Sequence, residues 1–79
     1  MKYYTMRAEL LSAERRNCSV NGNPAYTLGL YYENEVIYCK TASDSQCAYG
    51  MSNYKIGDLI TVKGHYTRAG NFIIDYIKD

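Results

Sequence analysis

Few side chains in this sequence are of the types that perform chemistry, and their spacing matches no catalytic or metal motif. The reactive set is one histidine, His65, and three cysteines, Cys18, Cys39 and Cys47. A Cys₃His zinc site would use all four, but there is no Cys-x-x-Cys pair and Cys39 falls on an expected core face. Catalysis by His65 would need a nucleophile or acid in a recognisable motif with it, and there is none. We expect no metal, no cofactor and no enzymatic activity, with Asp75 as a structural hydrogen-bond partner of His65.

Tyrosine is the most informative residue type in the chain. The 79 residues include ten tyrosines, one phenylalanine and no tryptophan. A tyrosine ring is flat and apolar with a polar tip, which suits strands, half-buried positions and interfaces. A domain this small buries only about 60% of its unfolded surface, so its core is too small for ten rings. Several tyrosines should therefore reach the surface.

The charge balance limits the classes of partner. Nine basic and eight acidic residues leave a net charge of +1, far from the basic excess of a dedicated duplex-binding protein. No N-terminal segment has the pattern of a signal peptide, and no apolar run reaches the roughly 18 to 20 residues that span a membrane. We expect a cytoplasmic protein without membrane contact and with reduced thiols. One oxidised cysteine pair beside a free thiol is the alternative.

Hydrophobic periodicity predicts β-strands along the first half of the chain. Within Lys2 to Arg16, the even positions Tyr4, Met6, Ala8 and Leu10 alternate with Thr5, Arg7, Glu9 and Leu11, which predicts one long strand. Ala8 to Arg16 also has helix-forming composition, so a helix there is the alternative. Asn17 to Pro24 contains an Asn-Gly pair and a proline, and predicts a loop.

Ala25 to Thr41 predicts a β-hairpin. We place its turn at Asn34-Glu35, which pairs Tyr31 with Tyr38; a longer loop with a shifted register is the alternative. The apolar face then holds Leu28, Leu30, Tyr32, Ile37 and Cys39, and the opposite face holds Gly29, Tyr31, Tyr38 and Lys40.

Ala42 to Tyr54 is polar and irregular, and predicts a loop or a short helix. Ser43 would cap that helix in a Ser-x-x-Gln pattern with Gln46, and Gly50 would end it.

The last third of the chain predicts a second pair of strands. Lys55 to Asp58 has the composition of a turn, and we interpret Asp58 as a turn residue rather than as an active-site acid. Leu59 to Thr67 and Phe72 to Ile77 alternate and predict strands joined by a loop at Arg68 to Asn71. The alternation puts Phe72, Ile74 and Tyr76 on one face of the final strand.

This order of elements resembles the OB-fold, a five-stranded Greek-key barrel with a helix between the third and fourth strands. The most specific stretch is Ile56 to Gly64 (IGDLITVKG), which is similar to the entry into the fourth OB strand. Asn71 to Ile77 follows as a fifth strand would, and Gly64 permits the sharp bend of a small barrel. The resemblance implies an all-β fold in which residues 1–79 form a single OB-like domain.

The resemblance also implies a ligand site on the face of the second and third strands, framed by the loops after strand one and between strands four and five. On this chain that face carries Tyr31, Tyr38 and Lys40. The framing segments add Arg15, Arg16, Asn17, Arg68 and Asn71, and Lys63 is a further basic residue expected to contact phosphate.

Two functions fit this arrangement. The first is non-enzymatic binding of single-stranded nucleic acid or a nucleotide, with bases stacked on Tyr31 and Tyr38 and phosphates held by the basic residues. The second is a small protein-binding inhibitor or adaptor, such as a phage or mobile-element accessory factor, whose tyrosine face contacts a protein partner or a second copy in a homodimer. Tyrosine enrichment serves both functions, and the near-neutral charge favours the second.

Overall fold

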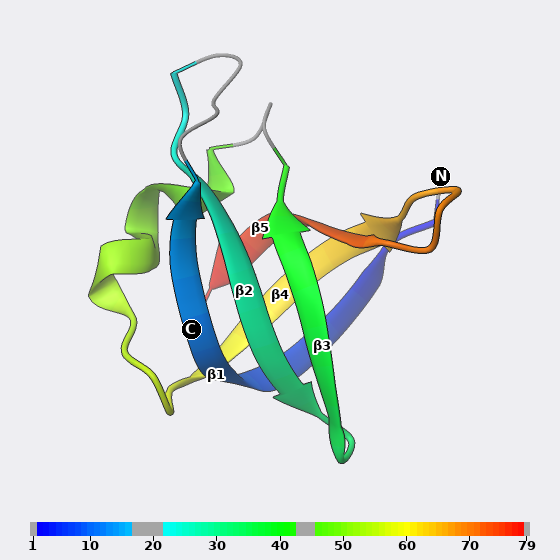
Figure 1. The fold of residues 1–79 in the computed structure, drawn as a ribbon, viewed down its shortest axis with the longest axis horizontal. Helices are drawn as coiled ribbons and strands as arrows, with labels where there is room; N and C mark the ends of the chain where they lie inside the picture. The colour runs from blue at the N-terminus through cyan, green and yellow to red at the C-terminus, as the bar shows by residue number, and fades with distance from the viewer. Residues whose placement is uncertain (1, 17–21, 43–45, 79) are drawn as a thin grey trace.

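The computed structural model describes residues 2–16, 22–42 and 46–78. Within these ranges, five strands and one short helix follow one another as β1 (Tyr4–Arg16), β2 (Ala25–Tyr32), β3 (Glu35–Thr41), the 3₁₀ helix η1 (Cys47–Asn53), β4 (Leu59–Tyr66) and β5 (Phe72–Lys78). The strands close into a barrel in the order β1-β2-β3-β5-β4 (Figure 1). The predicted all-β, OB-like barrel with a short helix between its third and fourth strands is confirmed.

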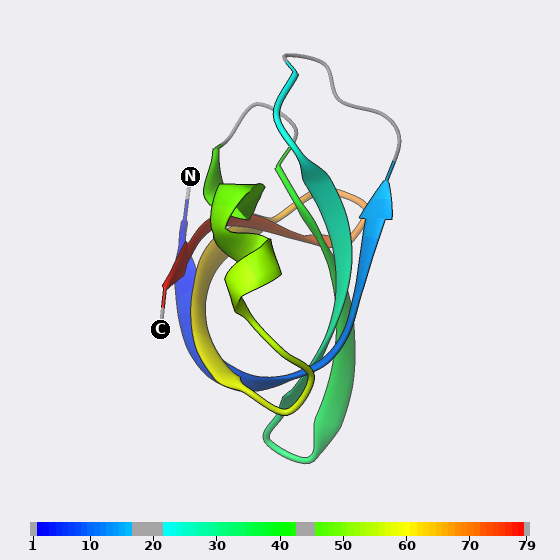
Figure 2. The ribbon, with the colours of Figure 1, turned by 90° about the vertical axis from the view of Figure 1, so that its left-hand side faces the viewer.

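The first strand belongs to both walls of the barrel. β1 is a continuous strand of 13 residues, so the helix alternative over Ala8 to Arg16 is wrong. Its first half pairs with β4 and its second half with β2, and a bulge lies between Leu10 and Ser12. A bulge bends and twists a strand, which lets β1 pass from one wall to the other. Figure 2 shows the N-terminal half of β1 with β4 and β5 on one side, and its C-terminal half with β2 on the other.

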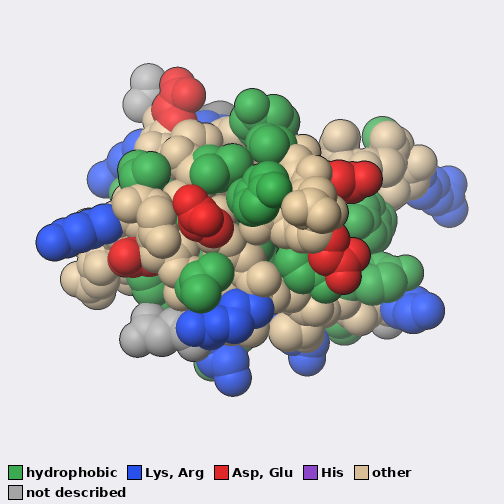
Figure 3. All heavy atoms as spheres, turned by 90° about the horizontal axis from the view of Figure 1, so that it is seen from below, with side chains coloured by type: hydrophobic (Ala, Val, Ile, Leu, Met, Phe, Trp, Pro, Cys, Tyr) green, Lys and Arg blue, Asp and Glu red, His purple; other side chains and the backbone are tan. Residues whose placement is uncertain are grey.

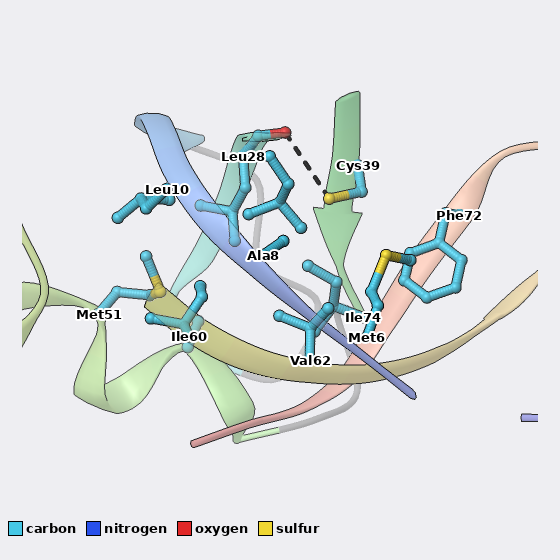
Figure 4. Packing of buried hydrophobic residues seen from close by; sticks show 12 residues of the cluster. Met6, Ala8, Leu10, Leu28, Cys39, Met51, Ile60, Val62, Phe72 and Ile74 are labelled. Carbon is cyan, nitrogen blue, oxygen red and sulfur yellow. Dashed lines mark hydrogen bonds between the residues drawn. The ribbon is translucent and has the colours of Figure 1, made fainter. Parts of the chain in front are cut away.

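A short parallel ladder closes the barrel between β3 and β5. It pairs residues 39–41 with residues 72–74. The inward side chains form an apolar core to which all five strands contribute (Figure 4). The largest fully buried side chains are Leu10, Leu28, Leu30, Ile60, Val62, Phe72 and Ile74.

The helix η1 closes one end of the barrel (Figure 2). Its residues Ala48 and Met51 join the core, and Figure 4 shows Met51 there. The predicted stop at Gly50 is wrong, because Gly50 does not adopt the positive φ of a helix-ending glycine and η1 continues to Asn53. The predicted cap Ser43 lies outside the described residues. No helix in the described part of the chain combines the length and hydropathy needed to cross a membrane.

The turns around β4 and β5 follow the sequence prediction. The Asp58 carboxylate accepts a hydrogen bond of 2.9 Å from the Lys55 amide, which confirms Asp58 as a turn residue. Gly57 and Gly70 have φ values of 98° and 86°, so each supplies the left-handed conformation that its loop requires. The loop predicted at Asn17 to Pro24 lies mostly outside the described residues.

A second bulge, between Lys63 and Gly64 of β4, changes the faces of β5. Gly64 pairs with Ile74 but Lys63 pairs with Tyr76, so Asp75 is an extra residue in β5. The side-chain alternation therefore reverses phase at Asp75. The prediction that Tyr76 shares the buried face with Phe72 and Ile74 is wrong, since 56% of Tyr76 is exposed.

Candidate binding site

The hairpin of β2 and β3 turns one residue earlier than the sequence suggested. Its two turn residues are Glu33 and Asn34, with φ values of 50° and 64°. Two successive residues with positive φ are typical of a type I′ turn, whose twist matches that of the flanking strands. The predicted turn at Asn34-Glu35 is therefore wrong, because Glu35 is the first residue of β3.

The shifted turn changes which tyrosine faces which residue. Tyr31 lies opposite Val36, and Tyr38 lies opposite Gly29. The predicted pair Tyr31–Tyr38 is wrong, and the two residues are diagonal neighbours on one face. A shift by two residues keeps every side chain on its predicted face. The predicted apolar face is confirmed, with Leu28, Leu30 and Cys39 buried and with Tyr32 and Ile37 packed against the core.

Tyr38 forms a flat platform on the outer face of the hairpin. It is 74% exposed, yet its Cε1 lies only 3.5 Å from the position that a Cβ on Gly29 would occupy. An aromatic ring opposite a glycine covers the gap that the missing side chain leaves in a sheet. The Ser12 hydroxyl oxygen lies nearer to that position, at 2.5 Å, so the Ser12 side chain and the edge of the Tyr38 ring share the space over Gly29, and most of Tyr38 stays open to solvent.

Tyr31 is held at the other end of this face. Its hydroxyl donates a hydrogen bond of 3.1 Å to Oδ1 of Asn34, and 42% of the residue is exposed. This bond ties the ring to the turn. Of the two tyrosine rings on this face, that of Tyr38 is therefore the more open, and it lies farther from the turn than Tyr31 does.

A shallow hollow of about 190 Å³ adjoins Tyr38. It lies where β3 meets the loop between β4 and β5, because Lys40 pairs with Ile73 in the closing ladder. Its lining residues are Thr27, Tyr38, Cys39, Lys40, Asn71 and Phe72. The structure thus brings together three predicted site residues, namely Tyr38, Lys40 and Asn71.

The predicted arginines do not all lie free in solvent. Arg16 donates a hydrogen bond of 2.9 Å from Nη2 to the Thr41 carbonyl oxygen, so its guanidinium links the ends of β1 and β3. Arg15 is exposed at the end of β1, and Arg68 is exposed in the loop before β5. Asn17 lies outside the described residues.

Lys63 lies on the opposite wall of the barrel, in a hollow that the sequence did not predict. This hollow of about 540 Å³ covers the outer face of β1, β4 and β5. It is lined by Tyr3, Thr5, Thr61, Lys63, Asp75, Tyr76 and Lys78. Beside it, Nδ1 of His65 lies 2.6 Å from Oδ2 of Asp75, which confirms the predicted structural hydrogen bond.

The charges at the turn end of the barrel are mixed. Figure 3 views this end, with acidic side chains towards the middle of the view and lysine and arginine side chains mostly at its margins. Such a surface does not favour a polyanion. An anionic ligand on the β2–β3 face would therefore bind nearer to Lys40 than to the turn.

Of the two described cysteines, Cys39 lies in the core and Cys47 is partly buried against it. The Cys39 thiol donates a weak hydrogen bond to the Leu28 carbonyl oxygen at 3.7 Å (Figure 4), and the Cys47 thiol donates one to the Ile74 carbonyl oxygen at 3.4 Å. Among the described residues, no three histidine, cysteine or acidic side chains are grouped so that they could hold a metal ion. Cys18 lies outside the described residues.

Burial makes Cys39 a sensitive reporter of barrel opening. Desolvation raises the pKa of its thiol from 9.0 to about 12. In a C18S/C47S background we expect Cys39 to resist a disulfide reagent at pH 8, because the thiolate fraction falls by about a thousandfold and the thiol is inaccessible. Labelling kinetics with and without urea would measure this. Rapid labelling of the folded chain would contradict it.

The same pKa shift gives a pH dependence of stability. Above pH 9.0 the thiol of the unfolded chain ionises, whereas the folded chain holds its proton until pH approaches about 12. This contribution to stability is therefore complete below pH 9.0 and is lost as pH rises through that window.

Comparison with known proteins does not assign this chain to a family. No protein-family model matches the chain, and no curated protein matches it either.

Proposed function

We propose that this protein binds single-stranded nucleic acid, with a base stacked on Tyr38 and the adjoining phosphates contacted by Lys40 and the loop between β4 and β5. The observation that carries the proposal is the ring of Tyr38, which lies against Gly29 and is 74% exposed. A ring that is already positioned loses little conformational freedom when a base stacks on it. Stacking tolerates any base, so the expected binding has little sequence preference.

The surroundings of the ring favour a single strand over a duplex. The hollow beside Tyr38 is shallow, with a volume of about 190 Å³, and it offers a lysine and an asparagine side chain rather than a deep cleft. A net charge of +1 provides few phosphate contacts. We therefore expect moderate affinity that falls as salt concentration rises.

A homodimer through the same face is the second candidate. Tyr31, Val36 and Tyr38 are all exposed on it, and together they form an apolar strip along the hairpin. Among the described residues, β3 pairs with β5 only through residues 39–41, so residues 35–38 have an open strand edge that a second copy could extend. Light scattering across a concentration series tests this candidate.

Replacing Tyr38 by alanine should weaken binding to a labelled oligo-dT by about 1–3 kcal/mol, the value of one base–aromatic stack. Fluorescence anisotropy at two salt concentrations would measure the loss. Tyr49→Ala removes another exposed tyrosine, on η1, and should leave affinity unchanged. Tyr31→Ala should have the smaller effect of the two hairpin tyrosines, because its ring is tied to the turn. If the wild-type chain does not bind oligo-dT and forms a concentration-dependent dimer, the nucleic-acid proposal is wrong.

A further inference from the structure

The outer face of β1, β4 and β5 gathers aromatic and basic side chains that are distant in sequence. The register places Thr5 opposite Lys63, and Lys63 opposite Tyr76. Two residues further along β4 and β5, on the same face, Thr61 lies opposite Lys78. These side chains line the hollow of about 540 Å³ described above, which falls in the size range of small-ligand sites.

The bulge in the β4–β5 ladder is what builds this hollow. With regular alternation, Asp75 and Tyr76 would point to opposite faces of β5. Because Asp75 is the extra residue at the bulge, both side chains line the hollow. Bulges commonly redirect side chains beside functional sites. Here the bulge moves a tyrosine ring from the barrel interior to a position next to Lys63.

The electrostatics of the hollow suit an anion. Lys63 and Lys78 both line it, and within the described residues neither forms an ion pair with a carboxylate. The Lys63 Nζ lies 5.5 Å from the centroid of the Tyr3 ring, a distance typical of a cation–π contact. The one carboxylate in the lining, Asp75, lies 2.6 Å from the imidazole Nδ1 of His65, so its Oδ2 is directed to a partner within the sheet.

We propose that this hollow is a second nucleotide-binding site, separate from the Tyr38 platform. A base stacks on Tyr76, which is 56% exposed, and the phosphate binds between Lys63 and Lys78. The hydroxyls of Thr5 and Thr61, which also line the hollow, can donate hydrogen bonds to the phosphate; Oγ1 of Thr61 itself accepts one of 3.2 Å from Nη1 of Arg7. The shared chemistry is a flat base joined to a phosphate ester, and its source is either a free nucleotide or one unit of a strand.

An NMR titration of the ¹⁵N-labelled full chain tests this site directly. Adding ATP should shift the amide resonances of Thr5, Lys63 and Tyr76, and adding inorganic triphosphate should shift those of Lys63 and Lys78 more weakly. Tyr76→Ala should reduce ATP affinity by roughly fivefold or more, the loss expected for one stacked base. Lys63→Ala should reduce it as well, and should also weaken its dependence on salt concentration.

Matched controls use exposed residues away from the hollow. Lys55→Ala, in the turn before β4, and Tyr49→Ala, on η1, should bind ATP as the wild-type chain does. The two control positions, like Lys63 and Tyr76, are exposed, so none of the four substitutions should disturb the core. An NMR spectrum with the dispersion of the wild-type chain would show that each variant is folded. Unchanged ATP affinity in both Lys63→Ala and Tyr76→Ala would overturn the proposal.

The Tyr38→Ala variant separates this site from the proposed function. If ATP still shifts the hollow in Tyr38→Ala, there are two sites; if those shifts vanish, the second site is disproved. Retained ATP shifts without any oligo-dT binding would support the hollow and contradict the nucleic-acid proposal. If a short oligo-dT competes with ATP for the shift of the Tyr76 resonance, a nucleic-acid strand can also occupy this site. If it does not compete, the ligand of this site is the free nucleotide.

Discussion

Replacing Gly64 by alanine is expected to destabilise the barrel by about 3 kcal/mol or more, among the largest effects of a single methyl group. Gly64 is buried in β4, opposite Ile74. A Cβ there would collide with the carbonyl oxygen of Ile73 and would lie 3.0 Å from the Phe72 ring. The carbonyl belongs to the backbone of β5, which also closes the barrel against β3. It cannot retreat without disrupting one of the two ladders.

Urea denaturation of the wild-type chain and of Gly64→Ala would measure this difference. Gly50→Ala is the matched control, because its φ is not positive and the nearest atom to an added Cβ is Nδ2 of Asn53 at 4.0 Å. That substitution should be neutral or stabilising by about 0.4–1 kcal/mol, since alanine restricts the unfolded chain. A Gly64→Ala midpoint equal to that of the wild-type chain would show that β5 shifts freely at the bulge.

The fold could be predicted because its main determinants are local. Alternation marked the first half of β1 and most of β4, and the Gly-Asp turn marked the entry into β4. From the sequence, Gly64 was predicted to permit a sharp bend of the barrel; the close approach of the Ile73 carbonyl to it was not predicted. Element order then sufficed to suggest the barrel.

The register of the hairpin could not be predicted because its turn lacks the usual signal. A type I′ turn normally contains Asn-Gly or Asp-Gly, and here the two positive φ values fall on Glu33 and Asn34. Glutamate in that conformation is uncommon. Both registers place the same side chains on the apolar face, so the hydrophobic pattern could not distinguish them either.

The candidate sites could be predicted only in part, because the sequence pattern does not show which strands lie side by side. Alternation indicates which side chains point outward, but the order in which strands close decides which of them share a wall. Tyr38, Lys40 and Asn71 meet because β3 pairs with β5. Lys63 faces the other wall, and Tyr76 joins it only because a bulge reverses the phase of β5. The isolated Gly64 within β4 lies at that bulge and is typical of one, but we interpreted it as a bend, so the reversal of phase in β5 was not predicted.

The two proposed sites depend on the same short piece of structure. β5 begins beside the Tyr38 hollow and continues into the hollow of Lys63 and Tyr76. Its first residue, Phe72, pairs with Cys39 of β3 and with Tyr66 of β4. Phe72 therefore connects the ladder that closes the barrel to both binding faces.

Replacing Phe72 by alanine should cost about 3–5 kcal/mol, as expected for removing a buried aromatic ring from a packed core. Phe72 is 2% exposed, its ring centroid lies 5.1 Å from that of Tyr66 in an edge-to-face contact, and it belongs to the same core cluster as Met6. Phe72→Leu keeps most of the volume and should cost only about 1 kcal/mol. Urea denaturation would give both values.

The thiol of Cys39 provides a second readout of the same substitution. Cys39 pairs with Phe72 across the β3–β5 ladder, and both residues line the hollow beside Tyr38. If Phe72 holds that ladder closed, Phe72→Ala should expose Cys39 to a disulfide reagent under conditions in which the chain is still folded, and Phe72→Leu should not. Loss of stability with Cys39 still protected would mean that the ladder closes without the ring. Phe72 would then act through the volume it fills, and the Tyr38 face would keep its shape in the alanine variant.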